Sequence, residues 1–220
     1  MTGERRKRLV VVLAVLSSVS FALLAHAALV ESLPPAWGAL LSLVPLLGLL
    51  AWTLRRAGGR VAFAALLALA AIGLWLGWDA LQRNFFSVFF VEHAAANLLL
   101  ALLFGRTLRA GAEPLVTRFA RMLHETLPPE VERYTRQVTL AWTVLFATLF
   151  TLSCLLYLGH FVAAWSFLAN IASPIAIGGM FLVEYGIRLR VLPHWHRVGI
   201  LGGIRAFSRH LGAARLESTR

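Results

Sequence analysis

The 220-residue chain is too apolar for an ordinary water-soluble domain. Hydrophobic residues make up 59% of it and charged residues 14%, whereas soluble domains contain roughly 45–50% and 25%. The formal net charge of +11 would suit a nucleic-acid-binding protein, but the basic residues lie in short segments between apolar runs. Composition therefore favours an integral membrane protein and excludes both a soluble globule and a nucleic-acid partner.

Six apolar segments are long enough, or nearly so, to cross a bilayer, which takes roughly 20 apolar residues in a helix. In hydrocarbon each backbone N–H and C=O must be paired within its own segment, and a helix achieves this. The sequence thus predicts an all-α, polytopic bundle of six transmembrane helices. They cover residues 9–30, 36–54, 61–81, 85–104, 138–158 and 164–187.

The distribution of basic residues predicts the orientation of this bundle. Cytoplasmic segments carry the excess of lysine and arginine, because these charges resist translocation. Four basic residues precede the first span, three lie between the second and third, six between the fourth and fifth, and seven follow residue 187. Only Arg83 falls on the opposite side. We therefore expect both termini in the cytoplasm.

The predicted soluble segments differ in size between the two sides. The outer loops, residues 31–35, 82–84 and 159–163, are very short, so we expect a single integral membrane domain, residues 1–220. The larger segments are a cytoplasmic loop, residues 105–137, and a cytoplasmic tail, residues 188–220. One alternative is a signal peptide, because a basic start and an apolar run precede Ala25-His26-Ala27, which matches an A-x-A cleavage site. Cleavage there would leave five helices.

The cytoplasmic loop contains a predicted amphipathic helix. Glu113-Pro114 suits a helix start, and apolar residues recur at helical spacing at Leu115, Phe119, Met122 and Leu123. The prolines at 128 and 129 end this helix. A second helix then runs into the span at 138–158, with Glu132 and Arg136 spaced for an ion pair.

Arginines of this loop form the first candidate site. The guanidinium group binds two oxygens of a carboxylate or phosphate at once, and an anionic leaflet attracts the same residues. The loop therefore fits either an interfacial hairpin that contacts membrane lipids or a docking face for an acidic partner. The candidate contacts are Arg106, Arg109, Arg118 and Arg121.

Polar residues inside the predicted spans form the second candidate site. An ionisable residue at the centre of a span costs roughly 2.5–3.5 kcal/mol on insertion scales, so each one is a functional candidate. The candidates are Glu92, His93, Asn97 and Asn170, which could also be structural polar packing. Glu92 and His93 are adjacent, so they point about 100° apart and need not touch.

No motif in the sequence predicts a catalytic residue, a metal or a cofactor. G-x-S-x-G, H-E-x-x-H, C-x-x-C, P-loop and G-x-G-x-x-G patterns are absent. His194-Trp195-His196 offers two metal ligands at an interface, which is a weak signal, and haem ligation by His26 and His93 lacks a second matched pair. We expect neither a metal nor a cofactor.

The loop and the final span together resemble a family of uncharacterised multi-spanning bacterial inner-membrane proteins. The resemblance covers about residues 85–207. It is carried by Phe104-Gly105-Arg106-Thr107-Leu108-Arg109, Glu113-Pro114-Leu115, Thr117-Arg118-Phe119-Ala120-Arg121, Arg133-Tyr134-Thr135-Arg136, Thr139, Trp142, Trp165-Ser166, Asn170, Pro174, Glu184-Tyr185 and Arg188. Genes of that family commonly lie among fatty-acid-synthase-like genes for aryl polyene pigments. The resemblance implies an inner-membrane location and a role in making or exporting a membrane-bound polyene lipid.

Three functions are compatible with these observations. The first is a non-enzymatic accessory protein that anchors an acyl-lipid biosynthetic complex, with its arginines recruiting an acidic acyl carrier protein or biosynthetic enzymes. The second is a small transporter or flippase for the lipid product, lined by the intramembrane polar residues. The third is a membrane enzyme acting on an acyl or polyprenyl chain, with Glu92 or His93 as general base.

Overall fold

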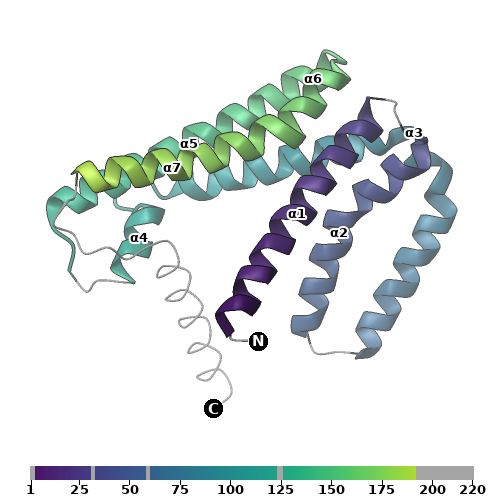
Figure 1. The fold of residues 1–220 in the computed structure, drawn as a ribbon, viewed down its shortest axis with the longest axis horizontal. Coiled ribbons are helices and arrows are strands. Elements are labelled where there is room, and N and C mark those ends of the chain that lie inside the picture. The colour runs from purple at the N-terminus through teal and green to yellow at the C-terminus, as the bar shows by residue number, and fades with distance from the viewer. Residues whose placement is uncertain (1–2, 31–32, 58–59, 123–125, 192–220) are drawn as a thin grey trace. The chain divides into compact units, whose positions relative to one another are not determined.

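A computed structural model describes residues 3–30, 33–57, 60–122 and 126–191, which form helices and turns without a β-strand (Figure 1). The predicted all-α class is therefore confirmed for this part of the chain. The helices are α1 (Gly3–Leu29), α2 (Pro35–Ala57), α3 (Arg60–Arg106), α4 (Leu115–Arg121), α5 (Pro129–Leu158), α6 (Val162–Phe167), the π-helical turn η1 (Leu168–Ala172) and α7 (Ser173–Val191). Residues 192–220 of the predicted tail lie outside the described residues.

Four helical stretches in the described part of the chain are long and apolar enough to cross a membrane. They are Val12–Leu29, Leu67–Arg106, Pro129–Leu158 and Val162–Val191, and Pro35–Ala51 is a shorter apolar helix. The six predicted segments all lie within helices, but those at 61–81 and 85–104 belong to one element, α3. The number of membrane crossings stays a prediction.

The predicted outer turn at residues 82–84 coincides with a kink in α3, where two helices meet without a longer loop between them. Asn84 has a non-helical backbone (φ −124°, ψ 16°). Its Nδ2 atom donates to the carbonyl oxygen of Ala80, four residues earlier, at 2.8 Å. That carbonyl is the acceptor of the regular helical ladder, and asparagine side chains compete for such groups. The Asn84 side chain therefore supplies a hydrogen-bond donor to the carbonyl oxygen of Ala80 at the point where the helix changes direction.

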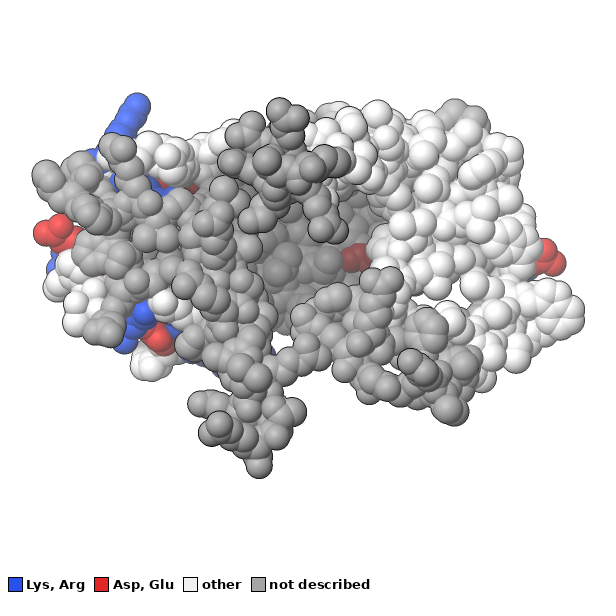
Figure 2. All heavy atoms as spheres, turned by 60° about the horizontal axis from the view of Figure 1, so that its bottom comes forward, with Lys and Arg blue, Asp and Glu red and all other residues white. Residues whose placement is uncertain are grey.

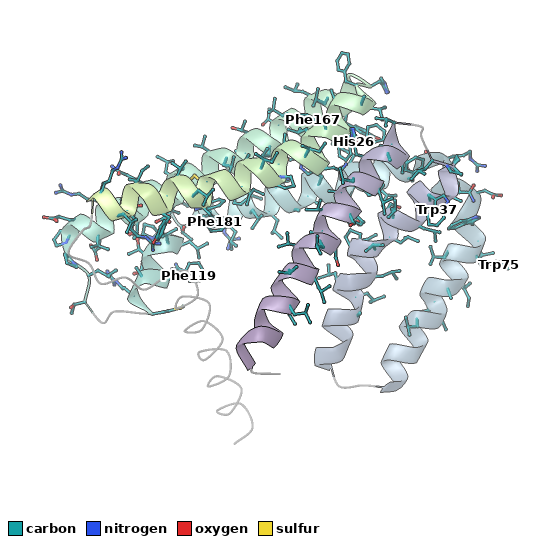
Figure 3. All side chains as sticks on the ribbon, viewed as in Figure 1. His26, Trp37, Trp75, Phe119, Phe167 and Phe181 are labelled. Atoms are coloured by element: carbon teal, nitrogen blue, oxygen red, sulfur yellow. The ribbon has the colours of Figure 1, made fainter. Side chains whose placement is uncertain are left out.

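Large apolar side chains cover the outer surfaces of the long helices. Leu76 on α3 and Leu182 on α7 keep 73% and 75% of their surface exposed, and Trp75 points away from its helix (Figure 3). Most visible described atoms in Figure 2 belong to uncharged residues; blue and red atoms lie close together toward the left of the view, and further red atoms appear near the centre and at the right edge. Continuous apolar surface of this kind fits a lipid environment and not water.

The chain divides into two compact units, which we describe separately. Unit 1 comprises Met1–Ala94 and Leu152–Pro174, and in it α1 packs against α2, α6 and η1. Its core contains Ala25 and Leu29 of α1, Phe89 of α3 and Trp165 of α6. Aromatic rings of α3 and α5 surround this cluster, including Phe86 and Tyr157.

Unit 2 comprises Ala95–Thr151 and Ile175–Arg220. Its core is a row of α5 residues spaced four apart, Tyr134, Val138, Trp142 and Phe146. Residues four apart lie on one face of a helix, so this row packs against the end of α3, Val116 of α4 and α7. The predicted helices of the cytoplasmic loop are confirmed, because α4 covers 115–121 and α5 runs without a break from Pro129 into the apolar segment.

Gly38 of α2 supports a first prediction about packing in unit 1. A Cβ atom on Gly38 would lie 2.5–2.9 Å from the ring of Phe85, whereas one on Gly48 of the same helix would meet nothing within 4 Å. We expect Gly38→Val to destabilise the protein by about 1–3 kcal/mol, because overpacking displaces the ring. Gly48→Ala should raise the stability by about 0.5–1 kcal/mol through helix propensity. Thermal unfolding in detergent would measure both, and equal effects would contradict the packing described.

Candidate functional site

The predicted candidate His93 lies at the centre of a buried polar network in unit 1. Its Nδ1 atom lies 3.1 Å from Oγ of Ser153 on α5, and its Nε2 atom lies 3.1 Å from Oγ of Ser173 on α7. Trp165 of α6 donates its Nε1–H to Ser153 Oγ at 2.9 Å. The ring of Trp165 also meets the His93 ring edge to face, with centroids 5.8 Å apart. One histidine thus joins α3 to α5, α6 and α7.

The partners of this network determine the direction of its hydrogen bonds. Ser173 donates its hydroxyl proton to the carbonyl oxygen of Leu168 at 2.8 Å. Ser173 must therefore accept from His93, so Nε2 carries the ring proton and Nδ1 accepts from Ser153. The network starts at an indole N–H, which does not release its proton, and ends on a backbone carbonyl. Its geometry suits holding helices together better than conducting protons.

A second polar group surrounds Ser166 of α6. Nδ1 of His26 on α1 lies 2.8 Å from Ser166 Oγ. The predicted candidate Asn170 donates from Nδ2 to the carbonyl oxygen of Ser166 at 3.1 Å and to its Oγ at 3.3 Å. Asn170 lies in the π-helical turn η1, and such turns alter backbone pairing and occur often at functional sites. Figure 3 shows His26 at the C-terminal end of α1.

The contact of His26 with Ser166 lies at the predicted cleavage site of the signal-peptide alternative. Ala25 is fully buried and Ala28 nearly so, and both lie beside His26 in the helix that packs on α6. A peptidase needs an accessible, extended segment, which this packed helix does not offer. We expect mass spectrometry of the protein purified from membranes to find the peptide spanning Ala25 to Ala28 intact. A mature chain starting at Ala28 would contradict the packing of α1.

The other two candidates in the predicted spans are Asn97 and Glu92. Asn97 is buried in unit 2. Glu92 is part of unit 1, and its Oε1 atom is buried without a hydrogen-bond partner among the described residues. The structure thus places His93 and Asn170 in two polar clusters of unit 1, whereas the buried Oε1 atom of Glu92 in the same unit has no hydrogen-bond partner among the described residues.

Some members of these clusters were not predicted from the sequence. Ser153, Ser166 and Ser173 each carry a hydrogen bond between helices, as does Tyr157, whose hydroxyl lies 2.8 Å from Ser87 Oγ. Single serines are common in apolar helices, so their presence is a weak signal. Sequence spacing along one helix cannot identify the histidine on another that each one contacts.

The candidate arginines lie in unit 2, and two of them form ion pairs. Arg121 contacts Glu113 at 3.0 Å and Glu132 at 2.6 Å, and Arg118 lies 3.9 Å from Glu113. The hydrogen bond to Glu132 and the charge of Glu113 hold the pKa of Arg121 above its ordinary value. The predicted pairing of Glu132 with Arg136 is therefore wrong, because Glu132 binds Arg121 and Arg136 donates to the carbonyl oxygen of Leu108. On α7, Glu184 and Arg188 form an ion pair at 3.6 Å.

Threonine hydroxyls fix α4 against α5 at this end of unit 2. Thr117 on α4 lies 2.7 Å from Thr135 on α5, and both are buried. The first backbone N–H groups of α4 donate to Thr107 and Thr139. These bonds satisfy donors that a short helix leaves unpaired. The position of α4, and hence of its arginines, is therefore defined by polar contacts.

Arg106 and Arg109 are exposed and form no ion pair with any described residue. Arg106 is in the last turn of α3, and Arg109 lies in the turn that follows. Of the four candidate arginines, these two are the ones without a carboxylate partner among the described residues.

The described residues contain no group of side chains that could hold a metal ion, and comparisons with known proteins found no match. No group of three or more metal-ligating side chains occurs among the described residues, and His194-Trp195-His196 lies outside them. No protein-family model, curated protein or solved structure matches the chain.

Proposed function

We propose that this chain is a multi-pass protein of the bacterial inner membrane that anchors an acidic soluble partner at its basic cytoplasmic end. The observation that carries this function is that Arg106 and Arg109 are exposed and form no ion pair with a described residue, beside an α4 that polar contacts hold in place. Six crossings with cytoplasmic termini would put these arginines on the same side as most of the basic residues.

An acyl carrier protein is the proposed partner, and its acidic surface would meet the arginine pair. Attraction between the basic and acidic surfaces speeds the association of the two proteins. It acts over about the Debye length, roughly 8–10 Å at physiological salt, and added salt weakens it. The assignment to acyl-lipid or aryl-polyene biosynthesis rests on the family resemblance alone. What the structure adds in support is that Arg106 and Arg109 are exposed and form no ion pair with a described residue.

Crosslinking of the purified protein to an acidic acyl carrier protein would test this function. Arg106→Gln with Arg109→Gln should reduce capture at least tenfold at low salt, since two charge-assisted contacts are lost. The matched control is Arg83→Gln, which removes one charge on the predicted outer side. Capture that is equal in all variants, or that persists unchanged in high salt, would contradict the proposal.

The choice of these two arginines follows from the structure. Replacing Arg118 and Arg121 would also break their contacts with Glu113 and Glu132, so a loss of binding could come from displacement of α4. Arg106 and Arg109 make no such contacts with the described residues, and their replacement leaves α4 in place.

A further inference from the structure

Glu92 is a carboxyl group in an apolar helix for which the described residues provide no partner. It lies within Leu67–Arg106, a stretch long and apolar enough to cross a membrane, and its Oε1 atom is buried without a hydrogen bond. An isolated carboxylate in hydrocarbon costs far more than a neutral carboxylic acid. An ion pair, a ligand or a proton must therefore offset that cost.

Glu92 forms no hydrogen bond or ion pair with the other titratable side chains described in unit 1. The other titratable side chains described in unit 1 are His26 on α1, Asp79, Arg83 and His93 on α3, Cys154 and Tyr157 on α5, and His160 after α5. His26 binds Ser166, Tyr157 binds Ser87, and His93 uses both ring nitrogens for serines. None of the ion pairs in the described residues includes Glu92.

The position of Glu92 along α3 also gives it access to the membrane. Residues three and seven apart share a helical face, so Glu92 continues the face of Phe85 and Phe89, which pack in the core of unit 1. Val91 beside it keeps 59% of its surface exposed. The side chain of Glu92 is only partly buried, so it lies at the border between the packed core and the apolar outer surface.

We infer that Glu92 is a proton-binding site reached from within the membrane, which takes up and releases a proton independently of the His93 network. Such a site is the minimum requirement for coupling proton movement to the movement of a membrane-borne solute. This inference does not depend on the proposed function of the basic end.

Carbodiimides of different solubility test this site on the full-length protein in lipid vesicles. Dicyclohexylcarbodiimide enters hydrocarbon and reacts with a protonated carboxyl group. The acid proton passes to one carbodiimide nitrogen, the carboxyl oxygen bonds to the central carbon, and an O-to-N acyl shift gives a stable N-acylurea. The whole reagent is added and no atom leaves, so mass spectrometry locates the adduct directly.

We expect dicyclohexylcarbodiimide to modify Glu92 at least tenfold faster than a water-soluble carbodiimide does, and Glu92→Gln to abolish that adduct. Asp79→Asn is the matched control, because Asp79 is an exposed carboxyl group on the same helix. Equal labelling by both reagents would overturn the inference, since it would show a water-exposed carboxylate. Absence of labelling by either reagent would overturn it as well.

Infrared difference spectra between acidic and basic buffer provide an independent measurement. The C=O stretch of protonated carboxylic acids should appear in the wild-type protein and in Asp79→Asn, and the component from Glu92 should be missing in Glu92→Gln, which keeps the other nine carboxyl side chains. Circular dichroism would confirm that both variants fold. A spectrum unchanged by Glu92→Gln would refute the assignment.

Discussion

Replacing Trp165 with alanine is expected to lower the free energy of unfolding by about 3–5 kcal/mol, the usual range for a buried tryptophan. Only 1% of its surface is exposed, and its ring contacts Phe86 and His93 edge to face. Helices in lipid associate through close packing and interhelical hydrogen bonds rather than the hydrophobic effect. A cavity at this junction would therefore remove packing that links α6 to α3.

Unfolding in mixed detergent micelles, followed by circular dichroism, would measure this loss. Trp75→Ala is the matched control, because 78% of that side chain is exposed, and it should change the stability by less than about 0.5 kcal/mol. Trp165→Phe separates packing from hydrogen bonding, since it keeps most of the ring and removes only the N–H donated to Ser153. It should cost about 1 kcal/mol. Equal losses for Trp165→Ala and Trp75→Ala would show that the core described for unit 1 is incorrect.

Replacing His93 with alanine is expected to have the second largest effect, a destabilisation of about 2 kcal/mol. The change removes two hydrogen bonds, to Ser153 and Ser173, and interhelical bonds in membrane proteins contribute about 0.6 kcal/mol each on average, with a maximum near 1.7. The missing ring adds a cavity term. The two serines keep their bonds to Trp165 and Leu168, which limits the loss.

The adjacent residue is the matched control for this prediction. Glu92→Gln should leave the stability unchanged or raise it, because the Oε1 atom of Glu92 has no hydrogen-bond partner among the described residues. Nitrogen NMR of labelled histidine adds a test that a packing role alone would not predict, namely a proton on Nε2 of His93. A proton on Nδ1 would contradict the hydrogen-bond directions assigned here.

The sequence predicted the two candidate regions but not their arrangement. Glu92 and His93 are neighbours in the chain and look like one site, yet His93 belongs to a satisfied network and Glu92 does not. The reason is helical geometry, which turns adjacent side chains about 100° apart. The four arginines likewise look equivalent in the loop, but Glu113 and Glu132 engage only Arg118 and Arg121.

The sequence by itself determined the all-helical class, the long apolar segments, and the two helices that begin within residues 105–137, namely α4 and α5. These follow from local physics, because apolar length, proline positions and helical spacing act within one segment. The tertiary structure decided which polar groups meet. His26 and Ser166 lie 140 residues apart in the chain, and His93 lies 60 residues from Ser153 and 80 from Ser173. Contacts of this kind depend on how helices pack, and the pattern along any single helix does not contain them.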